Sequence, residues 1–253
     1  GGTFGSCPFG KDENGNGVFW ANSLFEDNAE FGLGVHLGNQ YNNKNKDKKL
    51  WIIGGDGWAY DIGFGGLDHI LASGENVNIL VLDNQTYSNT GGQQSKATPT
   101  GASVKFAESG KTLRKKNLGQ IAMTYRDVFV AQVALGANIN QTIKVMKDAQ
   151  DYQGVSIVIA YAPCVNQGFD LSDMMAEMRK AVDCGFWPCY VYDPRTRAVT
   201  LFSQIKEEQY FDFLKGERRF AITMENNNDE LLQQQKNQAV EEYNILKNMT
   251  DNK

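Results

Sequence analysis

Two short stretches of the sequence combine residue types that could hold a metal-bound diphosphate. Asp56 stands among glycines in the run Gly54-Gly55-Asp56-Gly57, and Asn84 opens a second polar stretch. Their carboxylate and side-chain carbonyl are hard oxygen ligands of the kind that Mg²⁺ takes when phosphate oxygens and water complete its shell. The glycines allow the backbone to approach a phosphate closely. A turn before a helix and an asparagine at a strand end would explain the same residues, and their spacing alone does not decide.

A strand–helix–strand unit would bring these two stretches together. Residues 50–53 and 77–82 are short apolar runs, typical of buried strands, and apolar residues at helical spacing predict a helix over 58–73 that a glycine closes. The crossover makes the two strands parallel. Asp56 and Asn84 therefore emerge at the same carboxyl edge of the sheet, where open α/β folds bind ligands. The start of the helix adds free N–H groups and a dipole that favours an anion.

Composition narrows the class of protein. With 253 residues, 41% of them hydrophobic and 22% charged, the chain can form one large α/β domain. A net charge of −5 gives no basic surface for nucleic acid, and no apolar run is long enough to span a membrane. Cys7, Cys164, Cys184 and Cys189 form no CxxC motif and no disulfide framework, which favours a reducing compartment. No signal peptide is visible at Gly1, although a fragment would not show one.

The rest of the chain continues the alternation of helix and strand patterns. Residues 1–22 are expected to be irregular, Ser23 and Glu26 form a capping box for a helix that ends near Leu37, and 39–49 is a polar loop. Apolar patterns predict helices at 117–125, 140–150, 172–184 and 207–215, and strands at 128–133, 155–160, 187–192 and 220–223. We predict a mostly parallel α/β sheet with helices on both faces in one domain, residues 1–224, followed by a C-terminal helical tail, 225–253.

The segment 86–101 is long, polar and glycine-rich, which favours a role in covering a bound cofactor or substrate. Ser95, Lys96 and Thr98 could contact a phosphate or a substrate, and a solvated loop would explain them equally well. Further along, Lys111, Arg114, Lys115 and Lys116 form a basic run that we interpret as a solvated surface. The alternative is a docking patch for an acidic electron carrier.

The wider sequence is similar to the pyruvate:ferredoxin oxidoreductases. Gly-Asp-Gly followed by Asn84 resembles the thiamine diphosphate fingerprint. The segments that carry the resemblance are 22–27, 54–61, 65–69, 71–75, 87–93, 95–101, 158–162, 166–168 and 192–195. The similarity extends from about Ser6 to Phe220 and corresponds to the C-terminal, cofactor-binding domain of a much longer enzyme.

The resemblance implies the thiamine diphosphate-binding fold and a set of site residues. Mg²⁺ would be bound by Asp56, Asn84 and the backbone carbonyl of Thr86. The family often has threonine where Asn84 stands, and asparagine supplies an equivalent oxygen. Asn89 would reach the reacting carbon and the keto acid. The residues that would line thiamine diphosphate are Gly55, Asp56, Gly57, Trp58, Asn84, Gln85, Thr86, Tyr87, Ser88 and Asn89.

Cys164 follows the predicted strand at 155–160, on the same edge as the cofactor site. A single cysteine is more often a small buried hydrophobe. The resemblance implies instead that it gives one thiolate to a 4Fe-4S cluster. Such a cluster needs four ligands; Cys184 and Cys189 are expected in the core, and Cys7 does not match a family ligand. We expect the other ligands before Gly1, in a longer enzyme or a second chain.

The activity that the resemblance implies is oxidative decarboxylation of pyruvate to acetyl-CoA and CO₂, with electrons passed through iron–sulfur clusters to ferredoxin or flavodoxin. The glutamate that activates thiamine would come from another domain, so we expect this chain alone to be an incomplete site, in a homodimer in the cytosol or in an organelle such as the hydrogenosome. Alternatives are a fusion that reduces NADP, a non-oxidative thiamine-dependent decarboxylase, which would not need Cys164, and a module that has lost its cofactor. The identity of the 2-oxo acid is left open.

Overall fold

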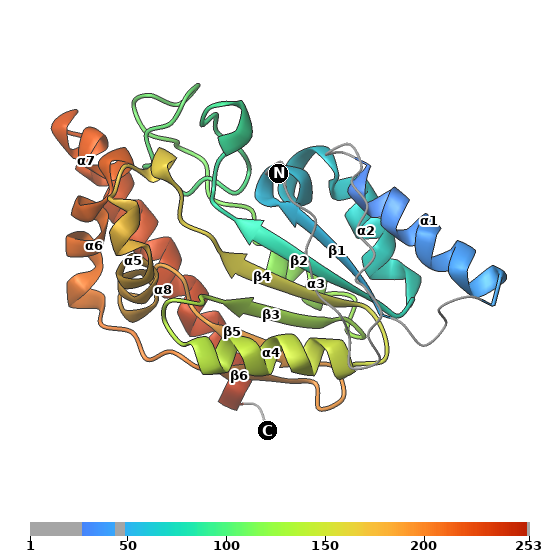
Figure 1. Ribbon diagram of the computed structural model, residues 1–253. Coiled ribbons are helices and arrows are strands. Elements are labelled where there is room, and N and C mark those ends of the chain that lie inside the picture. The colour runs from blue at the N-terminus through green and yellow to red at the C-terminus, as the bar shows by residue number, and fades with distance from the viewer. Residues whose placement is uncertain (1–26, 44–48, 252–253) are drawn as a thin grey trace.

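A six-stranded sheet forms the centre of the molecule (Figure 1). The computed structural model describes residues 27–43 and 49–251. The strands lie in the spatial order β1 (Leu50–Gly55), β2 (Val77–Asp83), β4 (Ser156–Tyr161), β3 (Phe129–Val133), β5 (Tyr190–Asp193) and β6 (Ala198–Leu201). The first four are mutually parallel, and β5 is antiparallel to both of its neighbours. The mostly parallel α/β class predicted from the sequence is therefore confirmed.

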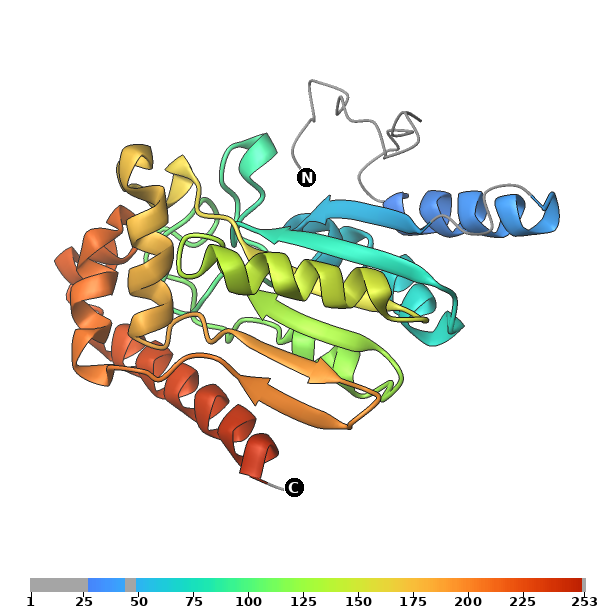
Figure 2. The same cartoon turned by 60° about the horizontal axis from the view of Figure 1, so that its bottom comes forward.

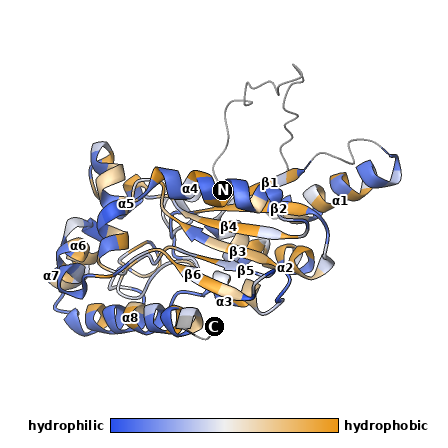
Figure 3. Ribbon diagram, turned by 90° about the horizontal axis from the view of Figure 1, so that it is seen from below, coloured by the Kyte–Doolittle hydropathy of each residue, from blue (hydrophilic) through white to orange (hydrophobic). Residues whose placement is uncertain are grey.

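Helices cover both faces of this sheet, as Figures 2 and 3 show. They are α1 (Asn28–Tyr41), α2 (Phe64–Ser73), α3 (Leu118–Met123), α4 (Ile139–Asp151), α5 (Met174–Asp183), α6 (Tyr210–Gly216), α7 (Arg218–Glu225) and α8 (Asp229–Asp251). Helix α4 lies on one face, and α2, α3 and α8 lie on the other. Among the described residues, no helix is both long and apolar enough to cross a membrane.

The central strands are buried on both faces because the helices cover both. Successive side chains point to opposite faces of a strand, so they divide between two cores. On β4, Ile157 and Ile159 belong to the larger core, whereas Val158 packs with Val145 and Ala149 of α4 in the smaller one. This arrangement explains why residues 155–160 form an unbroken apolar run in the sequence.

Caps and turns place the helices largely where the sequence predicts them. Gly74 ends α2 in a left-handed conformation, with φ of 70°, a geometry that glycine adopts without steric cost. The side chains of Asn117 and Asn138 accept hydrogen bonds from the first turns of α3 and α4. The predicted tail is helical as α8, and its Leu232 and Leu246 are buried in the larger core.

The structure corrects several predicted boundaries. The helix expected over 58–73 is two segments, a π-helical turn at Gly57–Ile62 and then α2, separated by Gly63. A Cβ atom on Gly63 would lie 2.0 Å from the Trp58 ring, so the close packing of this ring requires glycine at the junction. Helix α1 continues to Tyr41, which makes the start of the predicted 39–49 loop helical. Residues 44–48 and the capping box at Ser23 lie outside the described residues.

Two errors concern the C-terminal third of the chain. The strand predicted at 220–223 is wrong, because these residues lie inside α7 with Phe220 and Thr223 buried on one side. A four-residue run with three apolar residues fits either a strand or one helical turn, and periodicity cannot separate them. Strand β6, which pairs with β5 as a hairpin, was not predicted because it is short and half-exposed.

Candidate functional site

Asp56 and Asn84 meet at the carboxyl edge of β1 and β2. The two strands pair in parallel with Gly55 opposite Leu82, so the residues that follow them emerge side by side. Asp56 is fully buried. Its Oδ1 accepts a hydrogen bond from the backbone N–H of Asn84 at 3.4 Å, and its Oδ2 accepts one from the Ser95 hydroxyl at 3.2 Å. The two stretches that the sequence singles out therefore form one site.

The Asp56 carboxylate lies in a place that disfavours its negative charge. Burial, with the nearby Asp83 carboxylate as a second cause, raises the pKa of Asp56 to about 7, against opposing effects from Lys115 and the Asn84 N–H group. Within the described residues, no basic side chain forms an ion pair with it. A bound divalent cation would stabilise this anion directly.

The chemistry of the available donors fits Mg²⁺ shared with a diphosphate. The buried Asp56 carboxylate accepts the backbone N–H of Asn84, and the side-chain carbonyl of Asn84 accepts the Thr86 N–H. In the part of the chain that the structure describes, no group of three or more His, Cys, Asp or Glu side chains could enclose a metal ion. A site with so few protein ligands suits a metal that keeps water and phosphate oxygens in its shell.

The turn after β2 is organised by its own side chains. Asn84 Oδ1 accepts a hydrogen bond from the Thr86 N–H at 3.2 Å, and its Nδ2 donates to the Ser88 hydroxyl at 2.7 Å. Asn89 is exposed in the single helical turn Ser88–Thr90. The Thr86 hydroxyl is buried without a hydrogen-bond partner among the described residues. The turn therefore has a defined shape with Asn89 at its surface.

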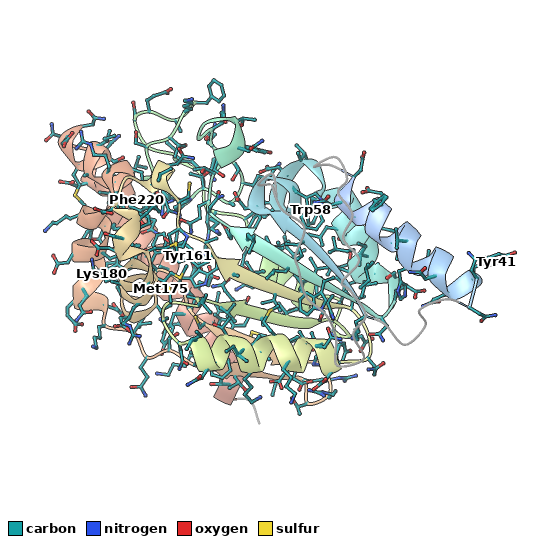
Figure 4. All side chains as sticks on the ribbon, viewed as in Figure 1. Tyr41, Trp58, Tyr161, Met175, Lys180 and Phe220 are labelled. Atoms are coloured by element: carbon teal, nitrogen blue, oxygen red, sulfur yellow. The ribbon has the colours of Figure 1, made fainter. Side chains whose placement is uncertain are left out.

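The first turn packs directly against the second. A Cβ atom on Gly57 would lie 2.6 Å from the ring of Tyr87, so a larger residue at position 57 would displace that ring. Trp58 is buried beside β1, where Figure 4 shows it, and a Cβ atom on Gly54 would lie 2.3 Å from its ring. The Trp58 side chain therefore has a packing role, in addition to its place in the predicted cofactor lining.

A buried network that the sequence did not predict lies behind Asp56. Asp83, the last residue of β2, is fully buried and accepts hydrogen bonds from the Tyr60 hydroxyl at 2.7 Å and from Lys115 Nζ at 2.6 Å. The ammonium of Lys115 also lies 5.0 Å from the ring centroids of Tyr60 and Trp187. Burial and the adjacent Asp83 charge raise the pKa of Tyr60 well above its usual value. A strand-final aspartate gives no sequence signal for such a network.

The basic run is not the solvated surface that we predicted. Lys111 is buried, and its Nζ donates hydrogen bonds to the carbonyls of Ser95 and Thr98 at 3.0 and 2.6 Å. Lys116 Nζ donates to the Tyr60 carbonyl at 3.0 Å, and Lys115 points to Asp83. Three of the four cations therefore face inward, so the docking-patch alternative loses the charges on which it depended.

The segment 86–101 is anchored to the site at several points. Ser95 and Thr98 are buried, and the Thr98 hydroxyl donates to the Gln85 carbonyl at 2.6 Å. Lys96 is exposed, and its Nζ lies 2.8 Å from the carboxylate of Asp61. A solvated loop therefore does not describe Ser95 and Thr98, whose contacts are with the protein itself.

Cys164 follows β4, the strand next to β2, and lies at the same edge. Its Sγ accepts a hydrogen bond from the Asn166 N–H at 3.4 Å and remains partly exposed. Gln167 of the same loop donates from Nε2 to the Asn84 carbonyl at 3.1 Å, which joins this loop to the turn after β2. Burial raises the pKa of the Cys184 and Cys189 thiols to about 12 each, as expected of core cysteines. Cys7 lies outside the described residues.

A buried ion pair contacts the end of β4, the strand that leads into the Cys164 loop. Glu217 and Arg219 are buried with a 2.7 Å contact, and the Tyr161 hydroxyl donates to Glu217 at 3.3 Å. Arg218 N–H donates to the carbonyl of Gly168 at the end of the loop. Figure 4 shows Tyr161 between the sheet and the helices around Phe220.

Comparison with known proteins gives a consistent result. The family model described as "Thiamine pyrophosphate enzyme, C-terminal TPP binding domain" matches residues 17–160. The chain is 40% identical over 290 residues to the pyruvate-flavodoxin oxidoreductase of Rhodospirillum rubrum, covering 88% of this chain and 24% of that protein. It is 39% identical over 296 residues to the pyruvate:ferredoxin oxidoreductase of Moorella thermoacetica, covering 87% and 25%.

A third relative differs in its named electron acceptor. The chain is 48% identical over 192 residues to the pyruvate dehydrogenase [NADP(+)] of Cryptosporidium parvum, covering 70% of this chain and 10% of that protein. The chain thus spans a quarter or less of the length of these relatives.

Proposed function

The chain belongs to the family of thiamine pyrophosphate enzymes, and from that membership we propose that it binds thiamine diphosphate with Mg²⁺ at the carboxyl ends of β1 and β2. The observation that carries this proposal is the buried Asp56 carboxylate beside the Asn84 turn, with no basic partner among the described residues. When bound, the cofactor supplies the carbanion chemistry that cleaves the bond next to a 2-oxo acid carbonyl. The protein binds it and orients it.

The proposed roles of the residues follow from their places in the two turns. Asp56, the Asn84 side chain and the Thr86 carbonyl hold Mg²⁺. Asn89, exposed at the tip of the second turn, contacts the keto acid. The residues that line the cofactor are Gly55, Gly57, Trp58, Gln85, Tyr87 and Ser88. Burial of Asp56 strengthens its attraction to a metal ion, because little water screens the charge.

For the complete enzyme we propose oxidative decarboxylation of a 2-oxo acid, with pyruvate as the substrate. Pyruvate and coenzyme A give acetyl-CoA, CO₂, a proton and two electrons, and the electrons pass through iron–sulfur clusters to ferredoxin or flavodoxin. The names of the relatives support this reaction. Because the chain spans a quarter or less of their length, we propose that other domains complete the site, in a homodimer located in the cytosol.

Cys164 is proposed as one ligand of a 4Fe-4S cluster. Its support is its place: it is partly exposed, at the edge that carries Asp56, in a loop bonded to the Asn84 carbonyl. Cys184 and Cys189 are buried elsewhere in the core, so the described residues offer the cluster a single accessible thiol. Residues 1–224 are proposed as the cofactor-binding unit, with 225–253 as a helical segment packed on it.

A second candidate is transfer of the electrons to NADP, which the similarity to the Cryptosporidium protein favours. The full-length protein, supplied with pyruvate and coenzyme A, is assayed with ferredoxin, flavodoxin and NADP⁺ as separate acceptors. Reduction of either carrier protein supports the first proposal, and reduction of NADP⁺ supports the second. Release of CO₂ that needs no acceptor and no coenzyme A would contradict both.

A further inference from the structure

The turn that carries the proposed magnesium ligands contains a strained residue. Gln85, between Asn84 and Thr86, has φ of 69°, in the left-handed region that residues with a Cβ atom rarely adopt. Both of its backbone groups are tied down: its N–H donates to Asp83 Oδ1 at 3.1 Å, and its carbonyl accepts from the Thr98 hydroxyl at 2.6 Å. The shape of the turn therefore depends on these two anchors.

Packing alone does not hold this turn. The Gln85 side chain lines a cavity of about 60 Å³ at the inner side of α8, together with Lys115, Trp187 and Glu242. Its side-chain carbonyl has no hydrogen-bond partner among the described residues. A strained conformation persists only when the surrounding structure fixes it, and the two backbone hydrogen bonds of Gln85 contribute to that constraint.

The anchor on the N–H side is a buried carboxylate that a lysine neutralises. Asp83 Oδ1 accepts the Gln85 N–H, and Oδ2 accepts both Lys115 Nζ and the Tyr60 hydroxyl. Asp83 is fully buried, whereas 24% of the Lys115 side chain is exposed. Because a buried carboxylate without a cation is costly, the contact with Lys115 stabilises Asp83 in its place and holds its orientation.

The anchor on the carbonyl side is held by a second lysine. Lys111 Nζ donates to the carbonyls of Ser95 and Thr98, which fixes the short segment between them. The Thr98 hydroxyl then reaches the Gln85 carbonyl, and the Ser95 hydroxyl reaches Asp56. Lys115 therefore holds the anchor on the Gln85 N–H, and Lys111 holds the anchor on the Gln85 carbonyl.

We propose that Lys115 is a positioning residue of the metal–diphosphate site: by holding Asp83, it keeps Gln85 left-handed and so fixes the turn that presents Asn84 and Thr86. This inference rests on the proposed binding of thiamine diphosphate and Mg²⁺ and specifies what organises that site. Lys115 itself touches neither of the proposed ligand residues. Its contact with Asp83 acts on Asn84 and Thr86 through the backbone of Gln85, whereas its charge also acts directly on Asp56.

Amide hydrogen exchange tests the clamp without any ligand. The Gln85 amide is compared in the wild type, in Lys115→Met and in the control Lys144→Met, which removes an exposed lysine paired with Asp148 on α4. The proposal expects exchange at Gln85 to accelerate at least about tenfold in Lys115→Met, while β2 stays protected and the control matches the wild type. Unchanged exchange at Gln85 would overturn the proposal.

Calorimetry with thiamine diphosphate and Mg²⁺ then measures the consequence for binding. We expect Lys115→Met to weaken magnesium-dependent binding by about tenfold or more, the effect of losing one hydrogen bond to a charged group. Glycine adopts a positive φ without strain, so the same substitution in a Gln85→Gly background should cost much less. Equal losses in both backgrounds would mean that Lys115 acts on stability or charge alone, which would contradict the proposal.

If Lys115→Met does not fold, Asp83→Asn replaces it, because the amide has one oxygen for the donors that the two carboxylate oxygens of Asp83 accept, and the same coupling to Gln85→Gly is expected. If the full-length wild type binds no thiamine diphosphate while exchange at Gln85 responds to Lys115→Met, the proposed function fails and the clamp stands. The two claims can therefore be refuted separately.

Discussion

Asp56→Asn should make the metal-free protein more stable, although it removes the proposed metal ligand. In the wild type, burial and the nearby Asp83 raise the pKa of Asp56 to about 7 from 3.8. Asparagine keeps an oxygen that can accept the Asn84 N–H and carries no charge. The substitution therefore removes a buried anion that the folded protein stabilises poorly.

The extra stability of Asp56→Asn over the wild type depends on pH. Below about pH 4 the carboxyl is protonated in both the folded and the unfolded chain, so it adds no pH dependence. Between pH 4 and 7 the folded chain keeps a proton that the unfolded chain has released, and the wild type loses stability as the pH rises. Above pH 7 the loss is complete, at up to about 4 kcal/mol. The advantage of Asp56→Asn should therefore grow from pH 4 to 7 and then stay constant.

Urea unfolding in EDTA, followed by tryptophan fluorescence at pH 5 and pH 8, measures this difference. Asp148→Asn, which changes a partly exposed carboxylate paired with Lys144 on α4, is the control and should show little change in the free energy of unfolding at either pH. With thiamine diphosphate and Mg²⁺ the advantage of the variant at pH 8 should shrink by about 2.7 kcal/mol, because ligand at a hundred times its Kd stabilises the wild type only. The reasoning would be refuted if Asp56→Asn were less stable than the wild type at pH 8 without metal. It would also be refuted if the difference in unfolding free energy were the same at pH 5 and pH 8.

A close glycine contact, a buried thiol and a buried ion pair each give a further prediction. Gly57→Ala should cost about 1–3 kcal/mol of unfolding free energy, because its Cβ meets the facing tyrosine ring, whereas Gly65→Ala, with open space around it, should cost nothing in urea unfolding. At pH 8, iodoacetamide should modify Cys184 far more slowly than Cys164 by peptide mass analysis, because the pKa of the buried thiol is raised to about 12. Arg219→Met should cost about 3–5 kcal/mol in urea unfolding, since it leaves a fully buried carboxylate without its cation. Equal losses of unfolding free energy for Gly57→Ala and Gly65→Ala would contradict the first prediction. Equal labelling rates for Cys184 and Cys164 would contradict the second. An unchanged urea midpoint for Arg219→Met would contradict the third.

The sequence predicts the first strand–helix–strand unit well because its signals are local. Two apolar runs, a Gly-Asp-Gly turn and a glycine at the helix end suffice to place Asp56 and Asn84 at one edge. In the structure, β1 and β2 pair in parallel with Gly55 opposite Leu82, as that placement requires. The same reasoning places the Cys164 loop, because β4 pairs in parallel with β2.

The network behind the site depends on contacts between distant segments, which no local pattern reveals. Lys115 is separated along the chain from Asp83, yet the two form one buried ion pair. A basic run in a polar stretch has the same composition whether its side chains face water or a buried carboxylate. The sequence also gives no signal for the strained conformation of Gln85, because glutamine has no preference for positive φ.

The central claim is that Asp56 binds a magnesium-bridged thiamine diphosphate. Calorimetric titration of thiamine diphosphate into this chain, with and without Mg²⁺ and alongside Asp56→Ala, tests it most directly. We predict binding that requires Mg²⁺ and that disappears in Asp56→Ala, while the variant stays folded by circular dichroism. Binding of equal strength in the variant, or binding that does not depend on Mg²⁺, would contradict the account.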